Sequence, residues 1–168
     1  MTMKSLKNIV INGFIVLGLS FGLMVSATAD YSLEEVEVGA ERGDRIAQSI
    51  LGSYYRDGRG VRQDYAKAFY WYQKSADQGY SGGQYYVGNS YISGQGVRQD
   101  YNKALEWFKK SAKQNNPVAQ STIGLMYEFG KGVRQNNTIA KEWYGKACDN
   151  GYQEGGCDHY KRLNEKGY

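Results

Sequence analysis

The chain has 168 residues, enough for one ordinary domain, and it carries 21 Lys and Arg against 17 Asp and Glu. Two of the lysines belong to the N-terminal segment described next, and the small basic excess that remains does not predict nucleic-acid binding. His159 is the single histidine, which excludes a multi-histidine metal site.

The N-terminal segment has the layout of a secretory signal peptide. Two lysines precede an apolar run over residues 9–25, and the small residues Ala27 and Ala29 follow it. We predict a signal peptide over 1–29 and a single mature domain over 30–168, exported to the periplasm or secreted. An uncleaved membrane anchor is the alternative, but the apolar run is shorter than the ~20 residues that span a bilayer. We therefore expect no stable membrane insertion after cleavage.

A repeat of 36 residues dominates the rest of the chain. The hexapeptide that begins at Gly60 recurs at Gly96 and, less closely, at Gly132. The same offset aligns identical residues in all three copies: Trp71, Trp107 and Trp143; Ala68, Ala104 and Ala140; and Tyr55, Tyr91 and Tyr127. Because a regular period defines the fold of a repeat protein, we divide the domain accordingly. We predict a leading helix over 31–43, three repeats at about 44–79, 80–115 and 116–151, and a capping helix over 153–166.

Each repeat has the pattern of a helix hairpin. In the first copy, Ala47, Leu51 and Tyr55 are spaced as in a helix that buries one stripe, and Gly58 can end that helix. The Asp64 carboxylate can cap a second helix, as Asn136 can in the third copy. The buried residues of that second helix are predicted to be Ala68, Trp71, Tyr72 and Ala76. Since one hairpin cannot bury both faces, the predicted fold is an all-α stack of hairpins.

Three glycines lie beside the buried stripe of the first helices, at Gly52, Gly88 and Gly124. A glycine costs about 1 kcal/mol in a helix, so its recurrence there predicts that a neighbouring helix approaches closely.

The C-terminal helix does not follow the repeat in strict register. A shift by one period places His159 and Tyr160 where Ile123 and Gly124 stand, which would bury a histidine. One extra residue in the preceding glycine loop would instead move Tyr160 into the apolar position and His159 to the solvent. We expect that second register.

Cys148 and Cys157 are the only cysteines. An even pair in an exported chain predicts a disulfide. Metal binding by this pair together with His159 is the alternative.

The motifs A-x-x-x-L-G-x-x-Y, G-x-G-V-x-x-D-x-x-K-A and W-x-x-K-[AS]-A resemble those of the Sel-1-like repeat family, over residues 39–151. The resemblance implies a right-handed α/α superhelix that acts as a protein-interaction scaffold or adaptor, with no shared catalytic residue and no cofactor. The placement of Cys148 and Cys157 resembles the secreted cysteine-rich branch, in which such a pair ties adjacent repeats.

Two other functions are alternatives, the first of them suggested by that branch. One is the binding of cell-wall peptides or β-lactams with weak hydrolysis, although the mature chain has no Ser-x-x-Lys, Ser-Asp-Asn or Lys-Thr-Gly motif. The other is an exported effector that acts on a host. We expect that the protein is not an enzyme and that its binding partner is a protein or a peptide. The partner's identity and the oligomeric state stay open.

The predicted binding surface lies on the side of each first helix that points away from the buried stripe. Its residues vary from copy to copy, and apolar or aromatic side chains occur where solvent alone would favour charge. The candidate residues are Ser49, Ser53 and Arg56; Tyr85, Asn89 and Ile92; and Ser121, Leu125 and Glu128.

Overall fold

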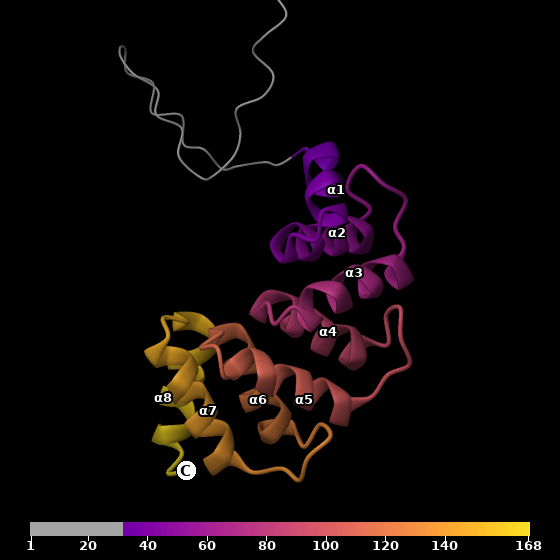
Figure 1. Ribbon diagram of the computed structural model, residues 1–168. Helices are drawn as coiled ribbons and strands as arrows, with labels where there is room; N and C mark the ends of the chain where they lie inside the picture. Colours follow the sequence, from indigo (N-terminus) through magenta and orange to yellow (C-terminus); the bar gives the residue numbers. More distant parts are fainter. Residues whose placement is uncertain (1–31) are drawn as a thin grey trace, which may run out of the picture. The chain divides into compact units, whose positions relative to one another are not determined.

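The computed structural model describes residues 32–168, and every regular element in this part of the chain is a helix (Figure 1). The predicted signal peptide lies outside the described residues. The elements are α1 Leu33–Glu41, α2 Arg45–Asp57, α3 Tyr65–Asp77, α4 Ser81–Ser93, α5 Tyr101–Ala112, α6 Pro117–Phe129, α7 Asn137–Asp149, the π-helical turn η1 Gln153–Cys157 and α8 Asp158–Glu165. The predicted all-α fold is confirmed.

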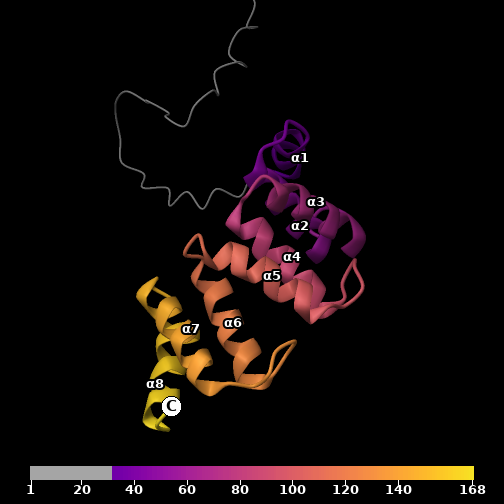
Figure 2. The same ribbon diagram turned by 60° about the horizontal axis from the view of Figure 1, so that its bottom comes forward.

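The helices pair as three hairpins, α2 with α3, α4 with α5 and α6 with α7, and each hairpin packs on the next (Figures 1 and 2). The first helices of the first two hairpins also meet, since α2 contacts α4. At the two ends, α1 packs on α2, and η1 and α8 pack on α7. Within residues 32–168, none of the helices has the length and apolar character needed to cross a membrane.

The predicted helix caps are confirmed. The Asp64 carboxylate accepts a hydrogen bond from the Lys67 backbone nitrogen at 3.0 Å, and the Asn136 side chain accepts one from Ile139 at 3.0 Å. At the other end of α2, Gly58 has a φ of +70°, a left-handed conformation that a residue with a Cβ adopts only at a cost. The capping residues therefore fix where each hairpin turns.

The predicted close approach at the helix glycines is also confirmed. A Cβ on Gly52 would lie 2.6 Å from the Tyr72 ring, and a Cβ on Gly124 would lie 2.7 Å from the Tyr144 ring. Gly88 faces Phe108 in the same way at 2.7 Å. In each hairpin an aromatic ring of the second helix thus lies directly on the backbone of the first.

A column of buried glutamines crosses the boundaries between the hairpins. These residues, Gln48, Gln84 and Gln120, are each 7% exposed or less, and we call them the glutamine column. Their side-chain oxygens accept hydrogen bonds from Gln78, Gln114 and Asn150, at 2.7, 2.9 and 3.0 Å. The Gln48 and Gln120 amides also donate to the carbonyls of Ala40 and Ala112. Gln48 therefore joins the end of α1 to the end of α3, and Gln120 joins the end of α5 to the end of α7.

The register predicted for the C-terminal helix is correct in its backbone and wrong in its side chains. The extra residue is present in η1, where Gly156 packs against the backbone of α7 at Cys148. Tyr160, however, is 40% exposed, and Leu163 is the residue of α8 that is buried. His159 does not point freely into solvent, because its ring stacks on Tyr144 with 4.7 Å between centroids. The π-helical turn changes the direction of the following side chains, which a simple one-residue shift does not capture.

Candidate functional site

The predicted binding surface is only partly accessible. Four of its nine residues are buried, which corrects the prediction that all of them point outward: Ser49 at 4%, Ser53 at 8%, Ser121 at 4% and Glu128 at 8% exposed. The others remain accessible to different degrees, with Leu125 exposed and the rest half-buried. We call these accessible side chains of α2, α4 and α6 the α2–α4–α6 face: Arg56, Tyr85, Asn89, Ile92 and Leu125.

The prediction failed at the buried positions because a first helix is covered on two sides. The helix α2 packs on α3 and also contacts α4, so a single buried stripe underestimates its burial. The Ser53 hydroxyl and the Tyr72 hydroxyl share a hydrogen bond of 3.1 Å inside that contact. Ser121 donates to the Gly155 carbonyl of η1. These small polar residues therefore hold the scaffold together and are not available to a partner.

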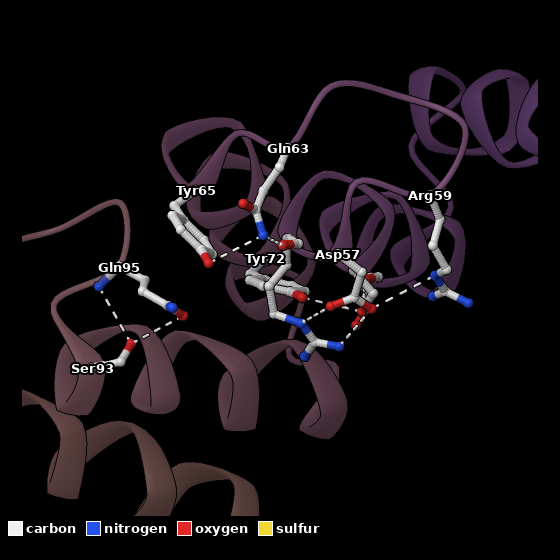
Figure 3. Close-up of polar contacts among 10 residues, drawn as sticks. Asp57, Arg59, Gln63, Tyr65, Tyr72, Ser93 and Gln95 are labelled. Carbon is white, nitrogen blue, oxygen red and sulfur yellow. Dashed lines mark hydrogen bonds and ion pairs between the residues drawn. The ribbon is translucent and has the colours of Figure 1, made fainter.

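A pocket of about 250 Å³ opens where α2 and α3 meet α4. We call it the Arg56 pocket, and Figure 3 shows Ser93 and Gln95 on one side of this region and Tyr65 and Tyr72 on the other. Its lining combines one cation with phenol, amide, hydroxyl and apolar groups: Arg56, Tyr65, Ala68, Tyr72, Tyr86, Asn89, Ser90, Ile92, Ser93 and Gln95. It includes no carboxylate.

Arg56 is held at this pocket by the neighbouring acid. Its Nε and Nη2 atoms donate to the two carboxylate oxygens of Asp57, at 2.7 and 3.0 Å. These hydrogen bonds raise the pKa of Arg56 above its ordinary value and lower the pKa of Asp57. The guanidinium carbon also lies 5.3 Å from the centroid of the Tyr86 ring, within reach of a cation–π interaction. Arg56 is therefore charged and restricted to one orientation.

Two tyrosines form the aromatic wall of the pocket. The rings of Tyr72 and Tyr86 stack with 4.7 Å between centroids and 17° between planes. Burial raises the pKa of Tyr72 to about 12, against the opposing effect of the hydrogen bond with Ser53. Tyr72 is thus a neutral phenol in the physiological range.

The matching position in the third hairpin is closed. Glu128 accepts a hydrogen bond from the Tyr144 hydroxyl at 2.8 Å and forms an ion pair with Arg162 of α8, also at 2.8 Å. Burial alone would raise the pKa of Glu128, but the hydrogen bonds from Tyr144 and Arg162 outweigh it and lower this pKa. The carboxylate is already satisfied inside the protein.

Cys148 and Cys157 are joined in a disulfide, as predicted. Because their sulfur atoms are bonded to each other, neither cysteine can act as a thiolate ligand. The alternative metal site formed with His159 therefore has no sulfur ligand. Among residues 32–168, no three His, Cys, Asp or Glu side chains gather in a way that could hold a metal ion.

Comparison with known proteins matches the repeats directly. The Sel1 repeat family model matches residues 45–80, 81–116 and 117–152, each boundary one residue after the one predicted. The chain belongs to the Sel1 repeat family. Proteins built from Sel1 repeats are typically scaffolds for protein–protein interactions.

Solved structures support this assignment. A Sel1 repeat protein from Oxalobacter formigenes is 34% identical with a TM-score of 0.66, covering 79% of this chain and 97% of its own. A protective antigen of uropathogenic Escherichia coli with an SLR fold is 30% identical with a TM-score of 0.71, over 83% of this chain and 34% of the antigen. Helicobacter pylori cysteine rich protein B, at 21% identity and a TM-score of 0.59, covers 76% of this chain and 96% of its own and shares the fold. The chain is thus a right-handed α/α superhelix of Sel1 repeats.

One curated relative also matches, over a short stretch. A component of an ERAD-associated E3 ubiquitin-protein ligase from Arabidopsis thaliana, HRD3B, is 39% identical over 51 residues, which are 30% of this chain. The match spans only 8% of the length of that relative.

Sequence reasoning missed the glutamines that shape these Sel1 units. Gln63 and Gln99 donate to the carbonyls of Arg56 and Ile92, at 2.7 and 2.6 Å, and so cap the last turn of α2 and α4. Gln135 does the same for α6. All three belong to the recurring hexapeptide, so their recurrence was visible in the sequence although their capping role was not, and the glutamine column recurs at the same period.

Proposed function

We propose that this Sel1 repeat protein is an exported interaction scaffold that binds a segment of a partner protein on its α2–α4–α6 face. The observation that carries the proposal is the contrast between a repeated framework and a face that varies. The caps, helix glycines and glutamine column recur from unit to unit, whereas the face varies: Arg56 of α2 corresponds to Ile92 of α4, and Asn89 of α4 corresponds to Leu125 of α6. A surface that varies on an invariant support is the usual arrangement of a solenoid that recognises one specific partner.

Leu125 supports the apolar character of such a contact. It is 36% exposed on α6, and Phe129, one turn later on the same helix, is 62% exposed. Large apolar side chains that remain accessible next to polar groups are common in protein interfaces. A partner segment that covers them would gain about 25 cal/mol for each Å² of apolar surface removed from water.

The chain offers a matched pair of substitutions for testing this face. Leu125 and Val38 are apolar residues within helices, and they are 36% and 40% exposed. A glutamate at either position should leave the fold intact, but only Leu125→Glu places a charge on the proposed face.

The experiment is capture of partners from the envelope fraction of the producing cells. The bait is the protein expressed from the full sequence with a C-terminal tag, and mass spectrometry quantifies what it retains. We expect the unchanged protein and Val38→Glu to retain the same partner, and Leu125→Glu to lose at least about nine-tenths of it, the effect of burying an unpaired charge. Equal retention by both variants would place the binding site elsewhere.

Export is proposed on two grounds. The N-terminal segment has the layout of a signal peptide, and the described part of the chain carries a disulfide, which persists in oxidising compartments. Mass analysis of the intact protein from the cell envelope should show a chain that begins at Asp30. Recovery of a membrane-bound chain that retains Met1 would contradict both cleavage and export as a free protein.

A further inference from the structure

We propose, on the basis of the scaffold function above, that the Arg56 pocket receives an acidic side chain of the partner segment. Its carboxylate would meet the guanidinium of Arg56, and its methylene groups would lie against Ala68 and Ile92. Both apolar residues line the same pocket as the arginine.

The first argument is the free edge of the guanidinium. Asp57 occupies the Nε and Nη2 atoms of Arg56, while Nη1 has no acceptor among the described residues 32–168. Arg56 lines the pocket and Asp57 does not. A carboxylate that enters the pocket therefore finds a donor whose position is already fixed by the ion pair on its other edge.

The second argument is the local charge. Asp57 is shared, because Arg59 lies 3.6 Å from its Oδ2 atom in addition to Arg56. The three side chains thus carry a net charge of +1, and no carboxylate lines the pocket. An anionic group complements this charge, whereas a lysine or arginine of a partner would be repelled.

The third argument concerns the helix ends at the pocket. The last turns of α2 and α4 present carbonyl oxygens, which would repel an anion. Gln63 and Gln99 already donate to the carbonyls of Arg56 and Ile92, so these dipoles are partly neutralised. The Tyr65 hydroxyl accepts a hydrogen bond from Gln63, which leaves its own proton available to a carboxylate.

The other hairpins do not repeat this site. The position of Arg56 is taken by Ile92 in the second copy and by Glu128 in the third, where the carboxylate is bound by Tyr144 and Arg162. The face therefore offers one cationic anchor, followed by apolar surface toward Leu125. The partner segment should accordingly carry one essential acidic residue close to an apolar one.

The test uses three short peptides and nuclear magnetic resonance of the arginine Nε–Hε groups in the full-chain protein. The probes are acetyl-Ala-Glu-Leu-Ala-amide, its glutamine counterpart, and the glutamine peptide with a free C-terminal acid. The glutamate peptide should shift the Arg56 signal saturably and bind at least about tenfold more tightly than the glutamine amide, the value of one charged hydrogen bond. Arg56→Gln should abolish that preference, and Arg98→Gln, an exposed arginine in the next turn, should keep it.

Four results would overturn the proposal: no binding of the glutamate peptide, equal binding of the glutamate and glutamine amides, a preference that survives Arg56→Gln, or binding of the free acid alone, which would indicate a C-terminus. The first, second and fourth of these results are measured on the unchanged protein, so they decide the question even if Arg56→Gln fails to fold. Failure here is separable from failure of the scaffold proposal. If Leu125→Glu loses the partner but the acidic peptide is not preferred, only the pocket proposal fails. If the acidic peptide is preferred but Leu125→Glu retains the partner, only the proposal for the wider face fails.

Discussion

The Tyr144 hydroxyl donates a 2.8 Å hydrogen bond to the carboxylate of Glu128, so that the second helix of the last hairpin is tied to its first helix by a buried ion. Arg162 of α8 completes the cluster at 2.8 Å. Glu128 was expected at the partner surface, and the structure shows that it joins the C-terminal cap to the repeats instead.

This cluster predicts a loss of stability in acid. The pKa of Glu128 is lowered in the folded state, so its contribution is complete above its ordinary pKa of 4.5 and disappears as the pH falls through the lowered value. The free energy of unfolding, measured with urea, should therefore fall between about pH 5 and about pH 2. Glu128→Gln should cost about 2 kcal/mol at neutral pH and weaken this dependence, since charged hydrogen bonds are lost. Glu142→Gln, an exposed control on α7, should match the unchanged protein, and an equal acid response in both variants would contradict the assignment.

A second prediction concerns the glutamine column. Gln120→Ala removes two hydrogen bonds between helices, the one donated to the Ala112 carbonyl and the one accepted from the Asn150 amide, and it empties the space of a buried side chain. We expect a loss of about 2–3 kcal/mol in thermal or chemical unfolding. Gln95→Ala, in an exposed turn, should change stability by less than about 0.5 kcal/mol. Similar stabilities of the two variants would mean that a glutamine of the column contributes no more to stability than a glutamine of an exposed turn.

Two glycines on neighbouring helices should respond in opposite directions to alanine. A Cβ at Gly124 would lie 2.7 Å from the Tyr144 ring, which its hydrogen bond to Glu128 prevents from moving freely. Gly124→Ala should therefore destabilise by about 1–2 kcal/mol, because overpacking exceeds the gain in helix propensity. At Gly145 the nearest atom is 3.3 Å away, in the exposed ring of Tyr160, and Gly145→Ala should stabilise by up to about 1 kcal/mol. Melting temperatures that change in the same direction would refute the distinction.

The disulfide should protect the C-terminal cap. Cys148 and Cys157 are nine residues apart, and closing so short a loop constrains the unfolded chain by roughly 2.7 kcal/mol. In the double variant Cys148→Ser/Cys157→Ser, amide hydrogen exchange should accelerate in α7, η1 and α8 and stay unchanged in α2 and α3, because units of a solenoid contact only their neighbours. Uniform acceleration along the chain would show instead that the domain unfolds as one cooperative unit.

The hairpins, their caps and the close helix contacts were predictable because their signals are local or periodic. Asp64 caps α3 through the backbone amide three residues later, and Gly124 recurs one period after Gly88. The fate of the surface positions was not predictable in this way. Ser53 is buried by Tyr72, and Glu128 by Arg162, which lies 34 residues further along the chain. A helical wheel assigns one buried side to a helix, and it has no information about a second neighbour supplied by another repeat.

The Arg56 pocket was predictable only in part. The sequence marked Arg56, Asn89 and Ile92 as candidates, and all three line the pocket. Their neighbours Tyr65 and Tyr72 belong to the second helix and were assigned to packing or to no role at all. A site formed between hairpins requires the packing of one repeat on the next, which the periodic pattern alone does not specify.

The glutamine column has a consequence for the length of the protein. Gln84 accepts from Gln114 at the far end of its own unit, and Gln48 and Gln120 show that the same position can donate to the helix end that precedes its unit. A duplicate of residues 81–116 inserted after itself would present a matching donor and acceptor at both new junctions. The fold can therefore gain whole units during evolution or by engineering without a new interface having to be invented. Growth at the C-terminus is different, because Glu128, Arg162 and the disulfide form contacts that no other unit can supply.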